Sequence, residues 1–260
     1  MNQILVSEKL YITPELKKKK KVYKFNFILS ILFVFVLVSF YLYSEYDRNK
    51  GVEASEQILA EMNQTLEDNK DETMASEDVL MVVLDGTEED YSAEEAETQT
   101  NKTQKTSVKE LNKNAEIETT ASGYQYKKIA TVNIPKINVN LVVLQGTTGS
   151  VAETKELLKV SPVKIHGYDP NEVGNFCIAG HNYRNTRFFS KVPTLVVGDI
   201  VKLTDLSGRT LTYTVYDKHT VIPDDTRDTT QLTGGHKELT LITCTDDSSE
   251  RVIVRCRETK

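Results

Sequence analysis

Cysteine is scarce in this sequence, and its scarcity excludes two kinds of site. The 260 residues include three cysteines, Cys177, Cys244 and Cys256, too few for a disulfide framework. No C-x-x-C spacing is present, so the usual cysteine pattern of a metal site is missing as well. We therefore expect neither a metal nor a cofactor. An odd count in a protein that faces outward leaves at least one free thiol to explain.

A surplus of basic residues is also missing where nucleic-acid binding would need one. The formal net charge is −6, but the acidity is concentrated in residues 45–122, with seven Lys or Arg against twenty-one Asp or Glu. Residues 123–260 are nearly balanced, with eighteen basic and fifteen acidic residues. A nucleic-acid-binding domain usually carries a clear basic footprint. We therefore expect no nucleic-acid partner.

The sequence contains one long apolar run. Phe25–Tyr43 holds nineteen residues without a charge, close to the roughly 20 that cross a bilayer as a helix. Lys17–Lys21 precedes the run, whereas Glu45 and Asp47 follow it. The lysine excess predicts a single-pass cell-membrane protein with a cytoplasmic N-terminus and an extracellular domain after Tyr43. The alternative is a cleaved signal peptide. The run is longer than a signal h-region of about 7–15 residues, and no A-x-A site follows it.

Composition predicts a stalk after this run. Its charge and scarce aromatic residues cannot bury enough apolar surface to offset chain entropy. Val52, Leu59, Met62 and Leu66 span about two heptads, fewer than a coiled coil needs, which favours a transient helix. The apolar island Val79–Leu84 fits either a docked strand or a helical turn. The expected regions are a cytoplasmic segment 1–24, a transmembrane helix 25–43, an acidic, largely disordered extracellular stalk 44–122 and a catalytic domain 123–260.

Short strands separated by turns are the pattern after Tyr124. Two helical stretches are expected, at Ala152–Leu158 and Arg187–Leu195. Seven to eight short strands with few helices predict a mainly β fold, a single closed or nearly closed barrel. The expected strands are Ile129–Ile134, Asn138–Leu144, Gly174–Gly180, Ile200–Leu203, Thr210–Asp217 with its continuation His219–Ile222, Leu239–Cys244 and Arg251–Arg257.

The last two of these strands place a thiol beside a guanidinium. In Leu239–Cys244, alternation puts Ile242 on the same face as Cys244, and the run ends at the cysteine. A polar turn, 246–249, leads to Arg251 at the start of the next strand. A thiolate is the reactive form of cysteine, and its attack on a carbonyl needs donors for the oxyanion. The hairpin therefore suggests a catalytic thiol and its oxyanion partner.

The residues alone leave alternatives open. Cys244 could be a small buried hydrophobe, which is the interpretation we favour for Cys177 and Cys256. His181 ends an apolar strand and opens a loop, so its side chain can face a cleft. The competing histidines are His166, His219 and His236, and the competing arginines are Arg255 and Arg257 on the face of Arg251, with Arg184 and Arg187 as weaker rivals.

Five motifs resemble those of the sortases, the membrane-anchored cysteine transpeptidases of Gram-positive bacteria. T-L-I-T-C at 240–244 resembles the family's highly specific signature, and R-V-I-V-R opens at Arg251. I-A-G-H-N at 178–182 is similar to the strand end that bears the family's histidine. F-F-S-K-V-P-T-L-V-V-G-D at 188–199 and I-P-K-I at 134–137 extend the resemblance over about 125–258. The resemblance implies the eight-stranded sortase β-barrel and selects Cys244, His181 and Arg251.

The same resemblance implies a reaction. Cys244 would cleave an LPxTG-like sorting motif of secreted proteins after its threonine and form a thioacyl intermediate, with His181 as acid and base. Arg251 would hold the motif and stabilise the oxyanion, and an amine of a cell-wall precursor or a pilin would release the product. The candidate groove residues are Thr243, Ile242, Asn182, Pro223 and Asp224. The alternatives are a cell-surface cysteine hydrolase of wall peptides and a non-catalytic anchored binding domain with Cys244 buried.

The subclass follows from smaller features. The segment between Val221 and Leu239 is too short for the helical insertion typical of class B. The F-F-x-x-V-x-x-L-x-x-G-D run resembles classes A, D or E, although Asn182 stands where many of these have arginine. No D-P-[FWY] motif of a class C lid is present. We therefore expect a class A, D or E type of sortase.

Overall fold

The chain divides into two compact units, residues 1–50 and 51–260. The computed structural model describes residues 14–75 and 108–259. Helix α1 (Pro14–Ala75) begins in the first unit. Among the described residues, this helix alone is long and apolar enough to cross a membrane. Its length and composition make it a candidate membrane anchor.

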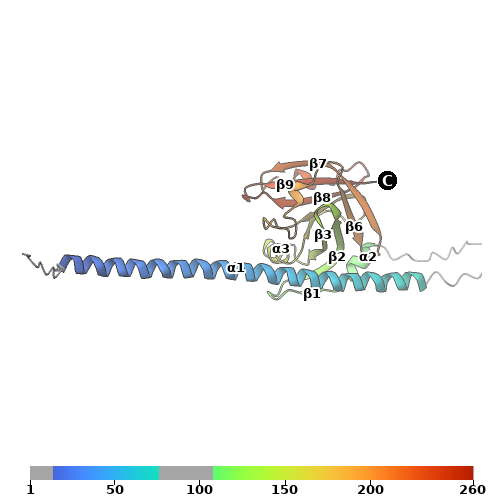
Figure 1. The fold of residues 1–260 in the computed structure, drawn as a ribbon. Helices are drawn as coiled ribbons and strands as arrows, with labels where there is room; N and C mark the ends of the chain where they lie inside the picture. The colour runs from blue at the N-terminus through green and yellow to red at the C-terminus, as the bar shows by residue number, and fades with distance from the viewer. Residues whose placement is uncertain (1–13, 76–107, 260) are drawn as a thin grey trace, which may run out of the picture. The chain divides into compact units, whose positions relative to one another are not determined.

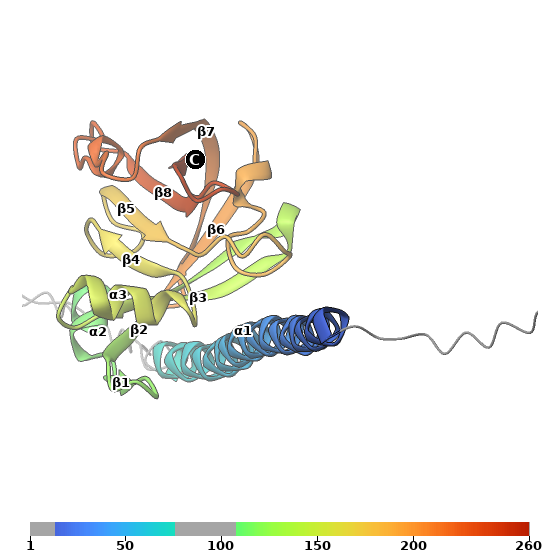
Figure 2. The ribbon, with the colours of Figure 1, turned by 90° about the vertical axis from the view of Figure 1, so that its left-hand side faces the viewer.

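A closed β-barrel forms the second unit. The strand order is β1-β2-β3-β4-β5-β8-β9-β7-β6 (Figures 1 and 2). A further pairing of β2 with β6 closes all strands except β1 into a barrel. The predicted mainly β barrel is confirmed. The strands are β1 (Glu118–Thr119), β2 (Gln125–Ile134), β3 (Val139–Gly146), β4 (Val163–His166), β5 (Gly174–Ala179), β6 (Ile200–Asp205), β7 (Thr210–Val221), β8 (Lys237–Cys244) and β9 (Arg251–Glu258).

Alternation along the strands fills the barrel interior. Phe176 and Ile178 of β5 and Leu239 and Leu241 of β8 belong to one buried apolar cluster, in which the last three are fully buried. Because successive strand residues point to opposite faces, the residues between them face the outside of the barrel. The outward face of β8 therefore carries Thr240, Ile242 and Cys244. This is the face on which any surface chemistry of the strand must occur.

Short helices connect the strands. Helix α3 (Val151–Leu158) begins after Ser150, whose hydroxyl accepts a hydrogen bond from Glu153 N, and it matches the expected helix. In 187–195 only the 3-10 helix η2 (Val192–Thr194) forms. Phe188 has a φ of 49°, which a right-handed helix does not accommodate, so the expected longer helix cannot begin there. The other short helices are α2 (Val108–Asn114), η1 (Pro135–Ile137) and η3 (Arg227–Thr229).

Part of the segment expected to be a disordered stalk has regular structure. Helix α1 continues to Ala75, and α2 and β1 lie within 108–122. Ile58 and Met62, one helical turn apart, are buried in a second apolar cluster with Tyr126 and Leu157. Burial of these side chains explains the difference, since packing against an apolar patch outside the barrel stabilises a helical segment whose heptad pattern is too short for a coiled coil. The apolar island Val79–Leu84 lies outside the described residues.

Strand β4 was not anticipated from the sequence. Its four residues, V-K-I-H, alternate apolar and polar side chains over too short a run to indicate a strand, and Ile165 and His166 are exposed. The strand is defined by its partners, because Val163 pairs with Ala179 of β5 and with Leu144 of β3. His166, one of the competing histidines, therefore ends a strand.

Candidate active site

The hairpin of β8 and β9 brings Cys244 and Arg251 together. The antiparallel register pairs these residues directly. The intervening turn is closed by Thr245 N donating to Glu250 O at 3.1 Å, and Ser248 takes a left-handed φ of 64°. Cys244 is half-buried at the end of its strand. The thiol therefore lies at the rim of the barrel beside the first residue of the next strand.

The guanidinium of Arg251 donates hydrogen bonds through Nη1 and contacts no carboxylate among the described residues. Nη1 donates to Ser248 O at 3.4 Å and to Glu250 O at 3.0 Å, and the structure shows no ion pair for it among the described residues. Both acceptors are backbone carbonyls of the exposed turn. A guanidinium offers several fixed donors and keeps its charge at any ordinary pH. Arg251 can therefore turn its remaining donors towards an anion next to Cys244.

His181 follows the end of β5, which runs parallel to β8. Ala179 pairs with Ile242, and Gly180 N donates to Ile242 O at 3.0 Å. Continuation of this register places His181 opposite Cys244. The ring of His181 lies 5.1 Å from that of Tyr183. Burial lowers the pKa of His181, and the charge of Lys159 lowers it further, so the imidazole is neutral at pH 7 and can accept a proton.

The other two thiols are in a different environment. Cys177 and Cys256 are fully buried, and all three cysteines are free. Burial raises the pKa of Cys177 to about 12 and also raises the pKa of Cys256 well above its ordinary value. Thiols that stay protonated are poor nucleophiles. The structure thus leaves Cys244 as the accessible thiol of the described chain.

The competing arginines and histidine are engaged by carboxylates. Arg255 Nη2 and Arg257 Nη2 lie 3.0 and 2.7 Å from the carboxylate of Glu238, which is 2% exposed. His219 lies between two carboxylates, with Nδ1 2.9 Å from Asp217 and Nε2 2.9 Å from Asp228. These groups are far along the strands from Cys244, because Arg255 pairs with Thr240. They stabilise the barrel where they lie.

The five groove candidates differ in their positions. Ile242 is half-buried on the face of Cys244, next to Ala179 and Ile253 in the sheet. Thr243 lies on the opposite face, 2% exposed, and its hydroxyl donates to Gly180 O at 2.8 Å. Pro223 and Asp224 are exposed after β7, and among the described residues no hydrogen bond or register pair joins them to Cys244. The structure brings Ile242 and Asn182 close to the thiol by contacts and register.

Asn182 joins the His181 loop to the Cys244 hairpin. Its Nδ2 donates to Cys244 O at 3.0 Å and to Asp246 Oδ1 at 2.9 Å. The sequence suggested Asn182 as a groove residue and left Asp246 without a role. No sequence signal could reveal this contact, because the residues are separated by more than sixty positions and only the parallel pairing of β5 and β8 makes them neighbours.

The loop between β7 and β8 is fixed by amides that the sequence did not single out. Gln231 Nε2 donates to Asn175 O at 2.9 Å, and Asn175 N donates to Gln231 Oε1 at 3.0 Å. Asn175 Nδ2 also donates to Asp228 O at 2.8 Å. This loop is therefore attached to the beginning of β5, the end of the strand remote from His181.

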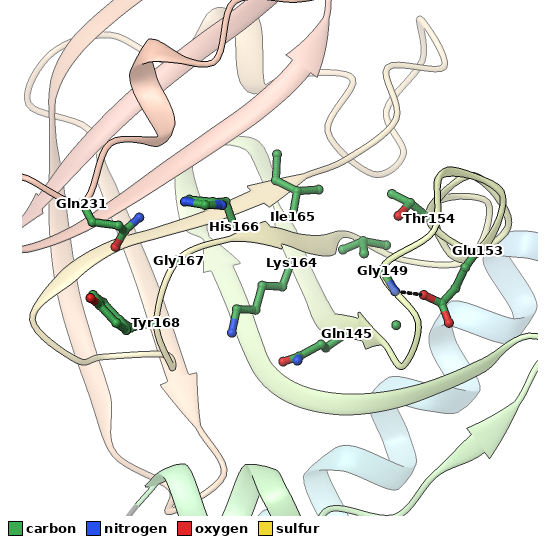
Figure 3. Close-up of a pocket in the computed structure, with 12 residues that line it drawn as sticks. Gln145, Gly149, Glu153, Thr154, Lys164, Ile165, His166, Gly167, Tyr168 and Gln231 are labelled. Carbon is green, nitrogen blue, oxygen red and sulfur yellow. Dashed lines mark hydrogen bonds between the residues drawn. The ribbon is translucent and has the colours of Figure 1, made fainter.

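A pocket of about 460 Å³ is lined in part by the four residues of β4 (Figure 3), and neither Cys244 nor Arg251 belongs to its lining. Lys164, Gln145 and Tyr168 contribute polar groups to it. The carboxylate of Glu153 accepts a hydrogen bond from Gly149 N at 2.8 Å and others from Thr147 N and Thr148 N, which commits it to the loop. None of the lining residues is a cysteine. The described residues also contain no cluster of three metal-ligating side chains.

Comparison with known proteins gives one family. Residues 132–259 match the model of the sortase domain. A search of the curated proteins found no match. The matched range runs from β2 to the end of β9, so it includes Cys244, His181 and Arg251.

Three solved structures are similar to the chain. The sortase D5 transpeptidase of Clostridium perfringens is 31% identical, with a TM-score of 0.45, over 52% of this chain and 80% of that one. Sortase C-1 of Actinomyces oris is 28% identical, with a TM-score of 0.44, over 50% and 73%. A lid mutant of sortase A from Corynebacterium diphtheriae is 26% identical, with a TM-score of 0.47, over 59% and 77%.

The motifs at 240–244 and at 178–182, the thiol at the barrel rim and the family match over residues 132–259 all agree. The chain belongs to the sortase family and is a cysteine transpeptidase.

Proposed function

We propose that Cys244 is the nucleophile of this transpeptidase, His181 its acid and base, and Arg251 the group that faces the oxyanion. One observation carries the proposal: a half-buried thiol at the end of β8 is paired in register with an arginine that has no carboxylate partner among the described residues. The parallel register of β5 adds a histidine opposite the same thiol.

The geometry supports a sequence of proton and acyl transfers. Neutral His181 accepts the thiol proton as the Cys244 sulfur attacks the scissile carbonyl carbon, and Arg251 faces the oxygen that becomes negative. Collapse of the tetrahedral intermediate breaks the C–N bond, and His181 returns its proton to the departing amine. The product at this stage is a thioester on Cys244. An incoming amine then attacks the thioester, forms the new amide and releases the thiol, again with His181 relaying the proton.

The substrates follow from the same chemistry. We propose that the acyl donor is an LPxTG-like sorting motif of a secreted protein and that the acceptor is a primary amine of a cell-wall precursor or a pilin. Ile242, Ala179 and Ile253 provide an apolar floor beside Cys244, which suits the aliphatic residues of such a motif. The loop that contains Pro223 and Asp224 is our proposed side wall.

We further propose that residues 25–43 of α1 cross the membrane with residues 1–24 in the cytoplasm. Lys17–Lys21 before the apolar run supports this orientation, because cytoplasmic flanks carry the lysine excess. The catalytic domain, which we place at 123–260, is then extracellular, as is the segment 44–122 that precedes it. Reaction of an engineered surface cysteine with an impermeant reagent on intact cells tests the orientation.

The first test removes the nucleophile. We expect the full chain with Cys244→Ala, in detergent, to keep its melting temperature and to lose peptide transfer by several orders of magnitude. Activity is read by mass spectrometry of a pentapeptide library containing LPxTG-like members, with and without an added amine. Undiminished transfer by Cys244→Ala would end the proposal. Water as the preferred acceptor when amine is abundant would favour a hydrolase, and resistance of Cys244 to alkylation in the folded protein would favour a binding domain.

A further inference from the structure

The backbone contacts between β5 and β8 stop just before the catalytic pair. Gly180 is the last residue of the β5 segment whose N–H bonds to β8, and its carbonyl accepts the hydroxyl of Thr243. Beyond Gly180 the ladder between the two segments ends. His181 belongs to the loop after β5, and Cys244 is the last residue of β8 before the turn. The carbonyl of His181 accepts Phe189 N at 3.1 Å, a contact within its own loop. The hydrogen bonds between β5 and β8 therefore hold the backbone before His181 and not the backbone after it.

Asn182 supplies the fixed point on the other side. Its amide donates to the carbonyl of Cys244 itself and to the carboxylate of Asp246, at 3.0 and 2.9 Å. The amide is also oriented, because its Oδ1 accepts Arg184 N at 2.9 Å, which turns Nδ2 towards the hairpin. His181 thus lies between Gly180 and Asn182, each of which is hydrogen-bonded to the Cys244 strand or its turn.

We propose that Asn182 is a positioning residue that sets the distance between His181 and Cys244, with Asp246 as its partner in the turn. This inference rests on the proposed roles of Cys244 and His181. Both polar ends of the Asn182 side chain are occupied within the protein, so it has little to offer a peptide in the groove. A misplacement of about 1 Å between reacting groups can cost on the order of 10²-fold in rate, which makes such a contact worth measuring.

The main test is Asn182→Ala in the full chain. We expect the rate of thioacyl formation to fall about 10–100-fold, with the KM for the sorting peptide within about twofold of the original. A second readout needs no substrate: the pH profile of Cys244 alkylation should move towards the profile of His181→Ala, since the imidazole no longer faces the thiol. A residue that only stabilises the fold would leave that profile unchanged in the molecules that remain folded.

The matched control is Asn185→Ala in the same loop. Asn185 Oδ1 accepts hydrogen bonds from Arg187 N at 2.8 Å and Ser190 Oγ at 3.2 Å, and both contacts lie within the loop rather than on the hairpin. We expect it to keep most of the activity and the original alkylation profile. Equal losses in both variants would overturn the proposal, because they would indicate general disorder of the loop.

Asp246→Ala completes the design. It removes one of the two acceptors of Asn182, so its effect should be smaller than that of Asn182→Ala, and the double variant should be no worse than Asn182→Ala alone. A raised KM with unchanged kcat in Asn182→Ala would instead make Asn182 a groove residue and refute the positioning role. Such a result leaves the inactivity of Cys244→Ala untouched, so the failure of this inference and that of the proposed function are distinguishable.

Discussion

The barrel carries a cysteine, a histidine and an arginine together at two places, and we propose catalysis at only one of them. At the rim, half-buried Cys244 faces Arg251 and follows the register of His181. Further along β5 and β9 and on the neighbouring strand β7, Cys177, Arg255 and His219 lie near Asp228 and Glu238, whose charges act on this second set. The residue types are the same, and the surroundings differ.

Carboxylates and burial account for the difference. At the second place, Glu238 and Asp228 hold the arginine, Asp217 and Asp228 hold the histidine, and burial keeps the thiol protonated. At the rim, Arg251 bonds to backbone carbonyls and the thiol reaches solvent. A cation that is already neutralised cannot stabilise a new anion. The catalytic roles that we propose for the residues at the rim therefore depend on the absence of carboxylate partners and of full burial there.

The largest contrast is expected between Arg251→Ala and Arg255→Ala. Loss of Arg251 should lower kcat/KM about 10²–10³-fold, the usual effect of removing an oxyanion donor, with the melting temperature unchanged. Loss of Arg255 should leave activity within about twofold and cost about 1 kcal/mol of stability, since Glu238 retains Arg257 and Tyr216. Transfer assays and urea titrations of both variants measure this. The reverse pattern would assign the oxyanion role to Arg255.

The pairing of Cys244 with Arg251 at the rim could be predicted from the sequence. The ion cluster around Glu238 at the second place could not. The alternation in Leu239–Cys244 and the short polar turn required Arg251 to start the next strand opposite Cys244, so a local pattern was enough. The ion cluster around Glu238 joins β7, β8, β9 and the loop after β7. These contacts depend on the pairing of β9 with both β7 and β8, which the local pattern of a single hairpin does not encode. For the same reason, the sequence indicated His181 but not its fixed point at Asn182.

The spacing of the strands in the sequence predicted a barrel. It did not predict β4 or the packing of α1 against the barrel. β4 has too few apolar residues to be recognised. Met62 looked like part of a weak heptad pattern, but it packs against barrel strands and α3 and not in a coiled coil. Its burial depends on Tyr126 and Leu157, whose position is set only once the barrel has formed.

A medium effect on stability is expected at Glu238. Glu238→Ala should lower the free energy of unfolding by about 2 kcal/mol, because Arg255, Arg257 and Tyr216 lose their common acceptor while staying partly accessible to water. Urea denaturation measures the loss, and the activity of the folded fraction should be unchanged. The control is Glu258→Ala, which breaks the partly exposed pair with Lys237 at 3.6 Å and should cost about 0.5 kcal/mol or less. Equal costs would show that the Glu238 cluster is an ordinary surface network.

The smallest expected effect is on the pH dependence of stability, which should have opposite signs for His219 and His181. Burial lowers the pKa of His219, but hydrogen bonds and charges from Asp228 and Asp217 outweigh it and the net pKa is raised. Its stabilisation is therefore fully present below the ordinary histidine pKa of about 6.5 and is lost as the pH rises through the raised value.

The pKa of His181 is lowered by burial, so this residue costs stability as the pH falls from about 6.5 towards the lowered value. Between pH 8 and pH 5.5, His219→Gln should lose about 1–2 °C of melting temperature relative to the original protein, because the ion pairs with Asp217 and Asp228 are missing at the acidic end. His181→Gln should gain a similar amount over the same range. Thermal unfolding of the three proteins at both pH values measures the difference. Shifts of the same sign would mean that the surroundings of the two histidines do not differ, and the contrast between the two places would be reduced to solvent access at Cys244.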